Sequence, residues 1–155
     1  MGLLIKNAKI ITQNQDRETI QGDILIEGGK IAKVGNGLPK EGEDDVLEGK
    51  EKIVFPGLVN AHTHGAMGLL RGYGEGLPLH RWLEEKIWPA EKKLNKEDIY
   101  WGTMMGAVEM IRSGTTCFNE MYMFGLRHMA KAVIETGVRA VLGKGVYDKS
   151  GERST

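Results

Sequence analysis

Short runs of alternating apolar and polar residues fill the first third of the chain, and this pattern predicts β-strands. It occurs in three ranges: 3–12, 23–27 and 30–34. Gly28 and Gly29 separate the second range from the third, which predicts a two-residue hairpin because both positions of a type I′ turn need positive φ. We therefore expect a small antiparallel β-domain over residues 1–55. The charged segment 37–52 is the part of the chain that most resembles a linker.

The pattern changes near Ile53, where a longer apolar stretch begins. Residues 53–59 are apolar almost throughout and lead into the polar segment 60–65, which is typical of a buried strand that ends at a polar site. Helical periodicity and short strands then alternate. The expected helices are 79–87, 96–112 and 126–136, and the expected strands are 115–118 and 138–146. This alternation predicts βαβ units and a parallel sheet, hence an α/β class for residues 56–155.

Local signals set the expected helix ends. Asn95 is the expected N-cap of the second helix, and Gly114 and Gly137 follow the second and third helices as stops. Pro89 is expected to interrupt the first helix because proline lacks an N–H and clashes with the preceding turn. The second helix has one apolar face at i, i+3, i+4 spacing, made of Trp101, Met104, Met105, Val108 and Ile111.

Composition and charge narrow the functional classes. Of 155 residues, 41% are hydrophobic and 27% charged, with 21 Lys+Arg against 21 Asp+Glu, as in an ordinary globular protein. With a net charge of zero, the chain does not have the excess of basic residues that is typical of nucleic-acid-binding proteins. No apolar stretch approaches the roughly 20 residues that a membrane span needs. We therefore expect a cytoplasmic protein that binds neither nucleic acid nor membrane. Cys117 is the single cysteine, so no internal disulfide can form.

The sequence His62-Thr63-His64 is the clearest candidate for chemistry. Side chains of a strand alternate between its faces, so both imidazoles project the same way and can bind one metal ion. Catalytic zinc typically has three protein ligands and one open position for water. The alternative interpretation is a pair of exposed or core histidines. The pair follows an apolar strand, at the edge where α/β folds place active sites, which favours the metal.

Several segments carry a resemblance to a known family. They are FPGLVNAHTH at 55–64, LLRG at 69–72, WL at 82–83, IWPAE at 87–91 and GTTCFNEMY at 114–122. Together they resemble the amidohydrolase superfamily, in the branch of 5-methylthioadenosine/S-adenosylhomocysteine deaminases and related chlorohydrolases. Asn60, where binuclear members usually carry Asp, also favours this mononuclear branch.

The resemblance implies a metal-dependent-hydrolase (β/α)8 TIM-like barrel, preceded by a small β-sandwich-type domain. A barrel typically needs about 250 residues, so residues 56–155 have room for about its first three strands. The barrel is therefore expected to be incomplete in this chain, with the missing half needed in cis or in trans. A homo-oligomer is possible.

The resemblance also implies roles for individual residues. His62 and His64 would be ligands of one zinc ion, with iron as the possible substitute. Glu91 matches a glutamate that holds ribose hydroxyls, although it could equally be a solvated charge at a helix end. Trp82 matches an aromatic residue of the substrate pocket, although a core tryptophan fits as well. Glu120 lies near a strand end and either reaches the site or is structural.

The implied reaction is zinc-dependent hydrolytic deamination of a purine nucleoside, S-adenosylhomocysteine or 5′-methylthioadenosine, to the inosine derivative and ammonia. No catalytic acid or base is assigned, because these are expected beyond residue 155. Two alternatives remain. One is another amidohydrolase, a guanine- or cytosine-type deaminase or a chlorohydrolase. The other is a catalytically incompetent module that needs a partner.

Overall fold

The structure is a computed structural model that describes residues 2–42 and 45–145. The chain divides into two compact units, Met1–Pro56 and Gly57–Thr155. In the described part of the chain, no helix is both long enough and apolar enough to cross a membrane.

The first unit is a mixed five-stranded sheet in the order β3-β2-β1-β4, with β5 also paired to β1. Its strands are β1 (Leu3–Ile11), β2 (Thr19–Glu27), β3 (Lys30–Gly35), β4 (Asp45–Glu48) and β5 (Ile53–Val54). Gly28 and Gly29 have φ of 56° and 74° between β2 and β3, which confirms the predicted hairpin. Ile5, Ala8, Ile10 and Ile24 form the core of this unit.

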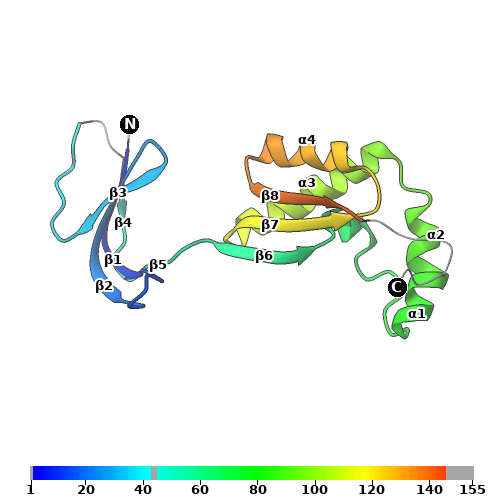
Figure 1. The fold of residues 1–155 in the computed structure, drawn as a ribbon. Helices are drawn as coiled ribbons and strands as arrows, with labels where there is room; N and C mark the ends of the chain where they lie inside the picture. The colour runs from blue at the N-terminus through cyan, green and yellow to red at the C-terminus, as the bar shows by residue number, and fades with distance from the viewer. Residues whose placement is uncertain (1, 43–44, 146–155) are drawn as a thin grey trace. The chain divides into compact units, whose positions relative to one another are not determined.

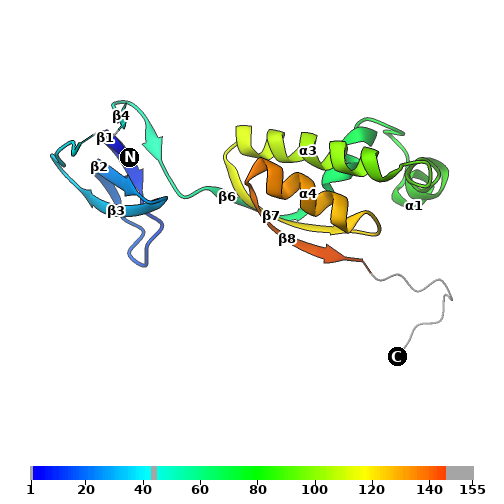
Figure 2. The same cartoon turned by 90° about the horizontal axis from the view of Figure 1, so that it is seen from above.

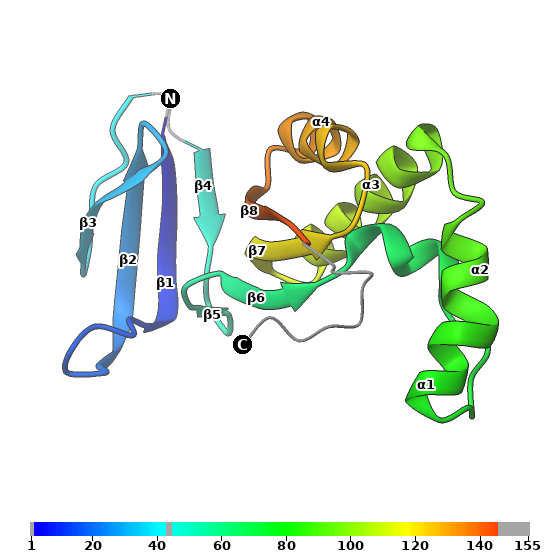
Figure 3. The same cartoon turned by 45° about the vertical axis from the view of Figure 1, so that its right-hand side comes forward.

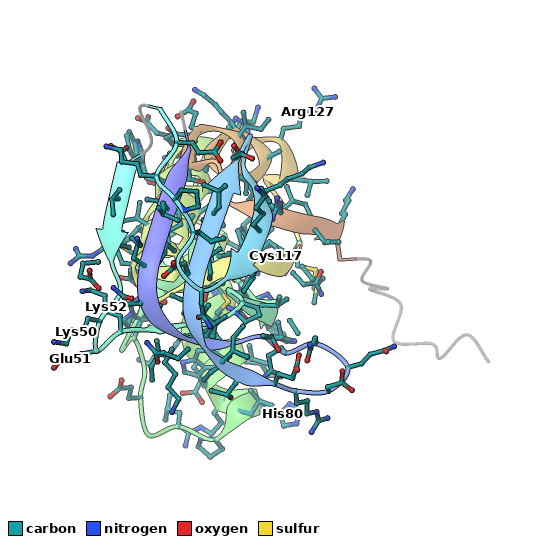
Figure 4. The ribbon with its side chains drawn as sticks, turned by 90° about the vertical axis from the view of Figure 1, so that its left-hand side faces the viewer. Lys50, Glu51, Lys52, His80, Cys117 and Arg127 are labelled. Atoms are coloured by element: carbon teal, nitrogen blue, oxygen red, sulfur yellow. The ribbon has the colours of Figure 1, made fainter. Side chains whose placement is uncertain are left out.

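The expectation of a purely antiparallel sheet is wrong. β4 and β5 both pair with β1 in parallel, and β4 lies inside the segment 37–52 that was the candidate linker. Its sequence, DVLE, has its two apolar residues side by side, so no apolar alternation marked the strand, and all four residues are exposed. The exposed turn Lys50–Lys52 then leads from β4 to β5 (Figure 4).

The second unit is a three-stranded parallel sheet in the order β6-β7-β8. β6 (Leu58–Thr63), β7 (Thr115–Tyr122) and β8 (Arg139–Lys144) alternate with α3 (Lys96–Arg112) and α4 (Leu126–Thr136). Both helices lie on the same face of the sheet (Figures 1 and 2). This arrangement confirms the predicted α/β class and parallel sheet.

A helical segment follows β6 and lies beyond its C-terminal end (Figures 1 and 3). It contains the 3₁₀-helix η1 (Gly65–Leu70), α1 (Leu79–Trp82), the π-helical turn η2 (Leu83–Ile87) and α2 (Trp88–Glu91). Pro89 does not end the helical run, contrary to expectation. It lies in the first turn of α2, where the missing N–H of a proline is tolerated.

The apolar run 53–59 is not one buried strand. Pro56 and Gly57 separate β5, in the first sheet, from β6, in the second. Among the described strands β6 pairs with β7 alone, and Leu58 and Val59 are therefore exposed. The side chains at the end of β6 lie beside this one described neighbour.

Helix α3 begins as predicted but buries a different face. Asn95 accepts hydrogen bonds from the N–H groups of Glu97 and Asp98, and the Asp98 carboxylate accepts one from the Asn95 N–H in return. The buried residues are Ile99, Gly102, Thr103 and Ala107, whereas Trp101, Met105, Val108 and Ile111 of the expected apolar face are exposed. Small residues are buried because η1 packs tightly here: a Cβ at Gly102 would lie 2.7 Å from the Ala66 carbonyl oxygen.

Candidate metal centre

The two histidines at the end of β6 converge on one point. Their Nε2 atoms lie 3.2 Å apart, and their ring centroids are 4.9 Å apart with the planes at 79°. This confirms that His62 and His64 share a face. His62 is exposed and His64 is partly exposed, so both rings are accessible.

Two asparagine side chains support the irregular backbone beneath the histidines. The β6–β7 register shifts between Asn60 and Thr63, which leaves backbone groups without regular partners. Asn60 Oδ1 accepts the His62 N–H at 3.2 Å, and Asn119 Nδ2 donates to the Ala61 carbonyl at 3.1 Å. Both hydrogen bonds fix the backbone at Ala61 and His62.

A backbone carbonyl fixes the tautomer of His64. Its Nδ1 lies 2.6 Å from the Met121 carbonyl oxygen, an atom that can only accept. The proton of a neutral ring is therefore on Nδ1, and the Nε2 lone pair faces His62. Metal-ligating histidines typically donate their other N–H in this way.

The spacing of the nitrogens suits a divalent metal. Two nitrogens roughly 2.05 Å from one tetrahedral zinc ion lie about 3.3 Å apart, close to the observed 3.2 Å between the Nε2 atoms. Imidazole nitrogen is a ligand that zinc and iron both accept. Within residues 2–42 and 45–145, no group of three His, Cys, Asp or Glu side chains is placed to hold a metal ion.

Glu120 lies directly behind this pair. It is opposite Thr63 in the β6–β7 register and its side chain has no exposed surface. Oε2 accepts the Gly65 N–H at 2.6 Å, and Oε1 lies 3.8 Å from His64 Nδ1. Desolvation raises the pKa of this carboxyl, against the opposing effect of the Gly65 N–H.

Glu91, at the end of α2, is also buried and is held by β7. The Tyr122 hydroxyl donates to Glu91 Oε1 at 2.6 Å. Burial, followed by this bond, raises the pKa of Tyr122, which therefore stays a neutral donor. The Tyr122 ring lies 6.3 Å from the His64 ring, so β7 links Glu91 to the histidines.

Trp82 lies in a different pocket. Its indole N–H donates to the Tyr73 carbonyl at 2.9 Å, and the ring lines an open cavity of about 360 Å³ with Met67, Leu70 and Tyr73. Glu91 lines a cavity of about 840 Å³ with Leu94, Ile99 and Phe124. Glu91 is thus connected to His64 through Tyr122, and Trp82 lies beside the loop that follows η1.

The sequence gives only weak indications of the two β7 residues that support the site. It does not identify Tyr122 as a site residue, and it leaves open whether Glu120 is structural or functional. Phe118, Glu120 and Tyr122 are buried at alternate positions of β7, so an extended strand from 115 to 122 would have placed them on one face. His80, on α1, is exposed, and Cys117 is a partly buried residue of β7 (Figure 4).

Comparison with known proteins identifies the family. The family model described as "Amidohydrolase family" matches residues 53–155. The chain belongs to the amidohydrolase family. It is 52% identical over 147 residues to a 5′-deoxyadenosine deaminase of Methanocaldococcus jannaschii, covering 94% of this chain and 33% of the relative. It is 51% identical over 148 residues to a 5-methylthioadenosine/S-adenosylhomocysteine deaminase of Syntrophomonas wolfei, covering 94% and 34%.

A solved amidohydrolase relative has the same fold over the matched part. The zinc-bound adenosine deaminase of Xanthomonas campestris superposes with a TM-score of 0.73 at 31% identity. The match covers 90% of this chain and 33% of that one. The chain therefore spans about a third of the length of the relatives it matches.

Proposed function

We propose that this chain is the N-terminal part of a zinc-dependent hydrolytic deaminase of adenosine derivatives, with S-adenosylhomocysteine or 5′-methylthioadenosine as substrate. The convergence of His62 and His64 Nε2 at 3.2 Å, at the end of the first parallel strand, carries the proposal. The names of relatives about half identical to the chain support the substrate class. The later barrel strands would complete the ligand set and supply the acid and base.

The histidines hold and orient the metal. His62 and His64 each offer an Nε2 lone pair, and the Met121 carbonyl keeps the second ring in the required tautomer. When bound, the metal supplies a Lewis acid and activates the attacking water. In the overall reaction the exocyclic C6–N6 bond of the adenine base breaks, water supplies the new oxygen at C6 and the hydrogen that the amine takes up, and ammonia leaves.

Glu91 would hold the ribose. A carboxylate accepts hydrogen bonds on both oxygens, and Tyr122 occupies Oε1, so lone pairs remain for vicinal hydroxyls, chiefly on Oε2. Burial makes such bonds stronger than they are in water. Trp82 lines a separate cavity beside Tyr73, so its packing on the purine or thioether stays a prediction from the sequence.

The test is ammonia release by the complete protein from several substrates. We expect turnover of 5′-methylthioadenosine, S-adenosylhomocysteine or 5′-deoxyadenosine, and much slower turnover of guanine, cytosine and a chlorinated triazine. If no adenosine derivative releases ammonia but guanine, cytosine or the chlorinated triazine is turned over, the proposal is wrong. The protein would then be the alternative amidohydrolase, a guanine- or cytosine-type deaminase or a chlorohydrolase. Failure with every substrate would favour the incompetent module.

Two variants test the assigned residues. Replacing His62 and His64 together by Ala should abolish stoichiometric zinc, and retained zinc would refute the ligand assignment. Glu91→Gln should lower kcat/KM for nucleosides about 10-fold or more, because a bond to a charged group is worth about 1.5–3 kcal/mol. Free adenine should be nearly unaffected. The matched control is Glu84→Gln, an exposed carboxyl on η2.

A further inference from the structure

Glu120 is a buried carboxylate with one oxygen unaccounted for. Its side chain has no exposed surface, and Oε2 accepts the Gly65 N–H at 2.6 Å. Oε1 is also buried, yet within the described residues it has no hydrogen-bond partner. Burying a carboxylate is costly unless it is paired, so the free oxygen needs an explanation.

The group that Oε1 faces is the His64 ring. Glu120 Oε1 lies 3.8 Å from Nδ1 of this ring, and the same Nδ1 lies 2.6 Å from the Met121 carbonyl oxygen. Two acceptors from consecutive residues of β7 therefore surround the one N–H of His64. Both favour the proton on Nδ1, which leaves the lone pair of Nε2 on the side of His62.

The same carboxylate also fixes the backbone next to this histidine. Gly65 directly follows His64 and begins η1, and its N–H is the partner of Oε2. A Cβ at Gly65 would lie only 3.1 Å from Oε2, so the absence of a side chain allows this close approach. One buried side chain thus holds both the ring and the turn after it.

We propose that Glu120 is the positioning residue of His64, forming a carboxylate–histidine–metal arrangement in which it orients the ring and increases the basicity of Nε2. The inference rests on the proposed metal at His62 and His64. Carboxylates placed behind ligating histidines act in this way in other metal sites, and their loss typically weakens metal binding about 10–100-fold. A carboxylate with a purely structural role would serve only as an acceptor for the Gly65 N–H.

Glu120→Gln separates the two roles, because the amide oxygen can still accept the Gly65 N–H while the negative charge is lost. Zinc affinity of the complete protein is measured by competition with a chromophoric chelator, beside the thermal unfolding midpoint. We expect affinity to fall about 10–100-fold. The control Glu109→Gln removes an exposed carboxylate that pairs with Arg71 in the cleft lined by His64. Its effect should be within about 2-fold, because exposed charges are screened.

The outcomes are distinct. If wild-type protein binds no zinc, the proposed function fails and this inference fails with it. If wild type binds zinc and Glu120→Gln binds it equally well, only the role of Glu120 is refuted. If Glu120→Gln does not fold, Glu120→Asp is measured in its place, because it keeps the charge but moves the carboxylate away from the His64 ring. A fall in zinc affinity beyond the about 2-fold range of the control supports the arrangement, and an affinity within that range overturns it.

Discussion

Replacing Gly125 by Ala should destabilise the second unit far more than the same change at Gly137. Both glycines flank α4 with left-handed backbone, at φ of 78° and 72°. A new Cβ at Gly125 would lie 2.6 Å from Cγ2 and 3.1 Å from Cβ of Ile99, whereas nothing lies within 4 Å of a Cβ at Gly137. Ile99 cannot easily yield, because it is 1% exposed and packs in the core with Tyr122 and Met129.

The magnitudes follow from two separate effects. Left-handed backbone costs a residue with a Cβ about 1–2 kcal/mol, and this applies to both variants. Overpacking a tight core adds about 1–3 kcal/mol, and this applies to Gly125→Ala alone. We therefore expect Gly137→Ala to lose about 1–2 kcal/mol and Gly125→Ala about 2–5 kcal/mol of unfolding free energy.

Tryptophan fluorescence in urea measures this difference cleanly. All three tryptophans, at positions 82, 88 and 101, lie in the second unit, so its unfolding dominates the signal. Combining Gly125→Ala with Ile99→Ala should cost less than the sum of the single changes, because the truncated side chain removes the Cγ2 contact. Equal losses for the two glycine variants, or strict additivity in the double variant, would refute the clash.

Further expectations concern two buried side chains of separate units. Tyr122→Phe removes the donor to buried Glu91 and should cost about 1.5–3 kcal/mol in the same urea assay, and a loss near zero would show that the pair is dispensable. Asp23 accepts hydrogen bonds from the N–H groups of Asn7 and Leu38, each at 2.8 Å. Asp23→Ala should therefore lower the unfolding free energy of the first unit by about 1–3 kcal/mol for each N–H left without a partner. Faster amide exchange in β1 and β2 would measure this loss. The Asn7 bond comes first among the causes that hold the pKa of Asp23 below its ordinary value. Its stabilising effect should therefore be complete above about pH 4, the unfolded pKa, and decline as pH falls through the lower folded pKa. Protection factors in β1 and β2, which are exchange rates corrected for the intrinsic pH dependence, should fall with it, and protection factors that stay constant across that range would contradict this.

Local features of the chain were predictable because neighbouring residues determine them. The turn at Gly28 and Gly29 needs positive φ at two adjacent positions, which few residue pairs permit. Asn95 and Asp98 make their capping bonds within three residues of each other. The shared face of His62 and His64 follows from the two-residue period of a strand, and the measured nitrogen separation agrees with it.

The tertiary structure decided everything that depends on residues far apart in the chain. β4 is a strand only because β1 pairs with it, and its own exposed residues carry no apolar pattern. The buried face of α3 is set by how closely η1 approaches Gly102, so small residues are inside and the larger apolar residues are outside.

The support of the two histidines is equally non-local. Glu120 reaches Gly65 across 55 residues, and Tyr122 reaches Glu91 across 31. The sequence determined which residues could bind a metal, because ligand chemistry and strand period are local properties. Only the parallel pairing of β6 with β7 decided which buried groups hold those residues in place, because that pairing brings distant side chains to the same sheet edge.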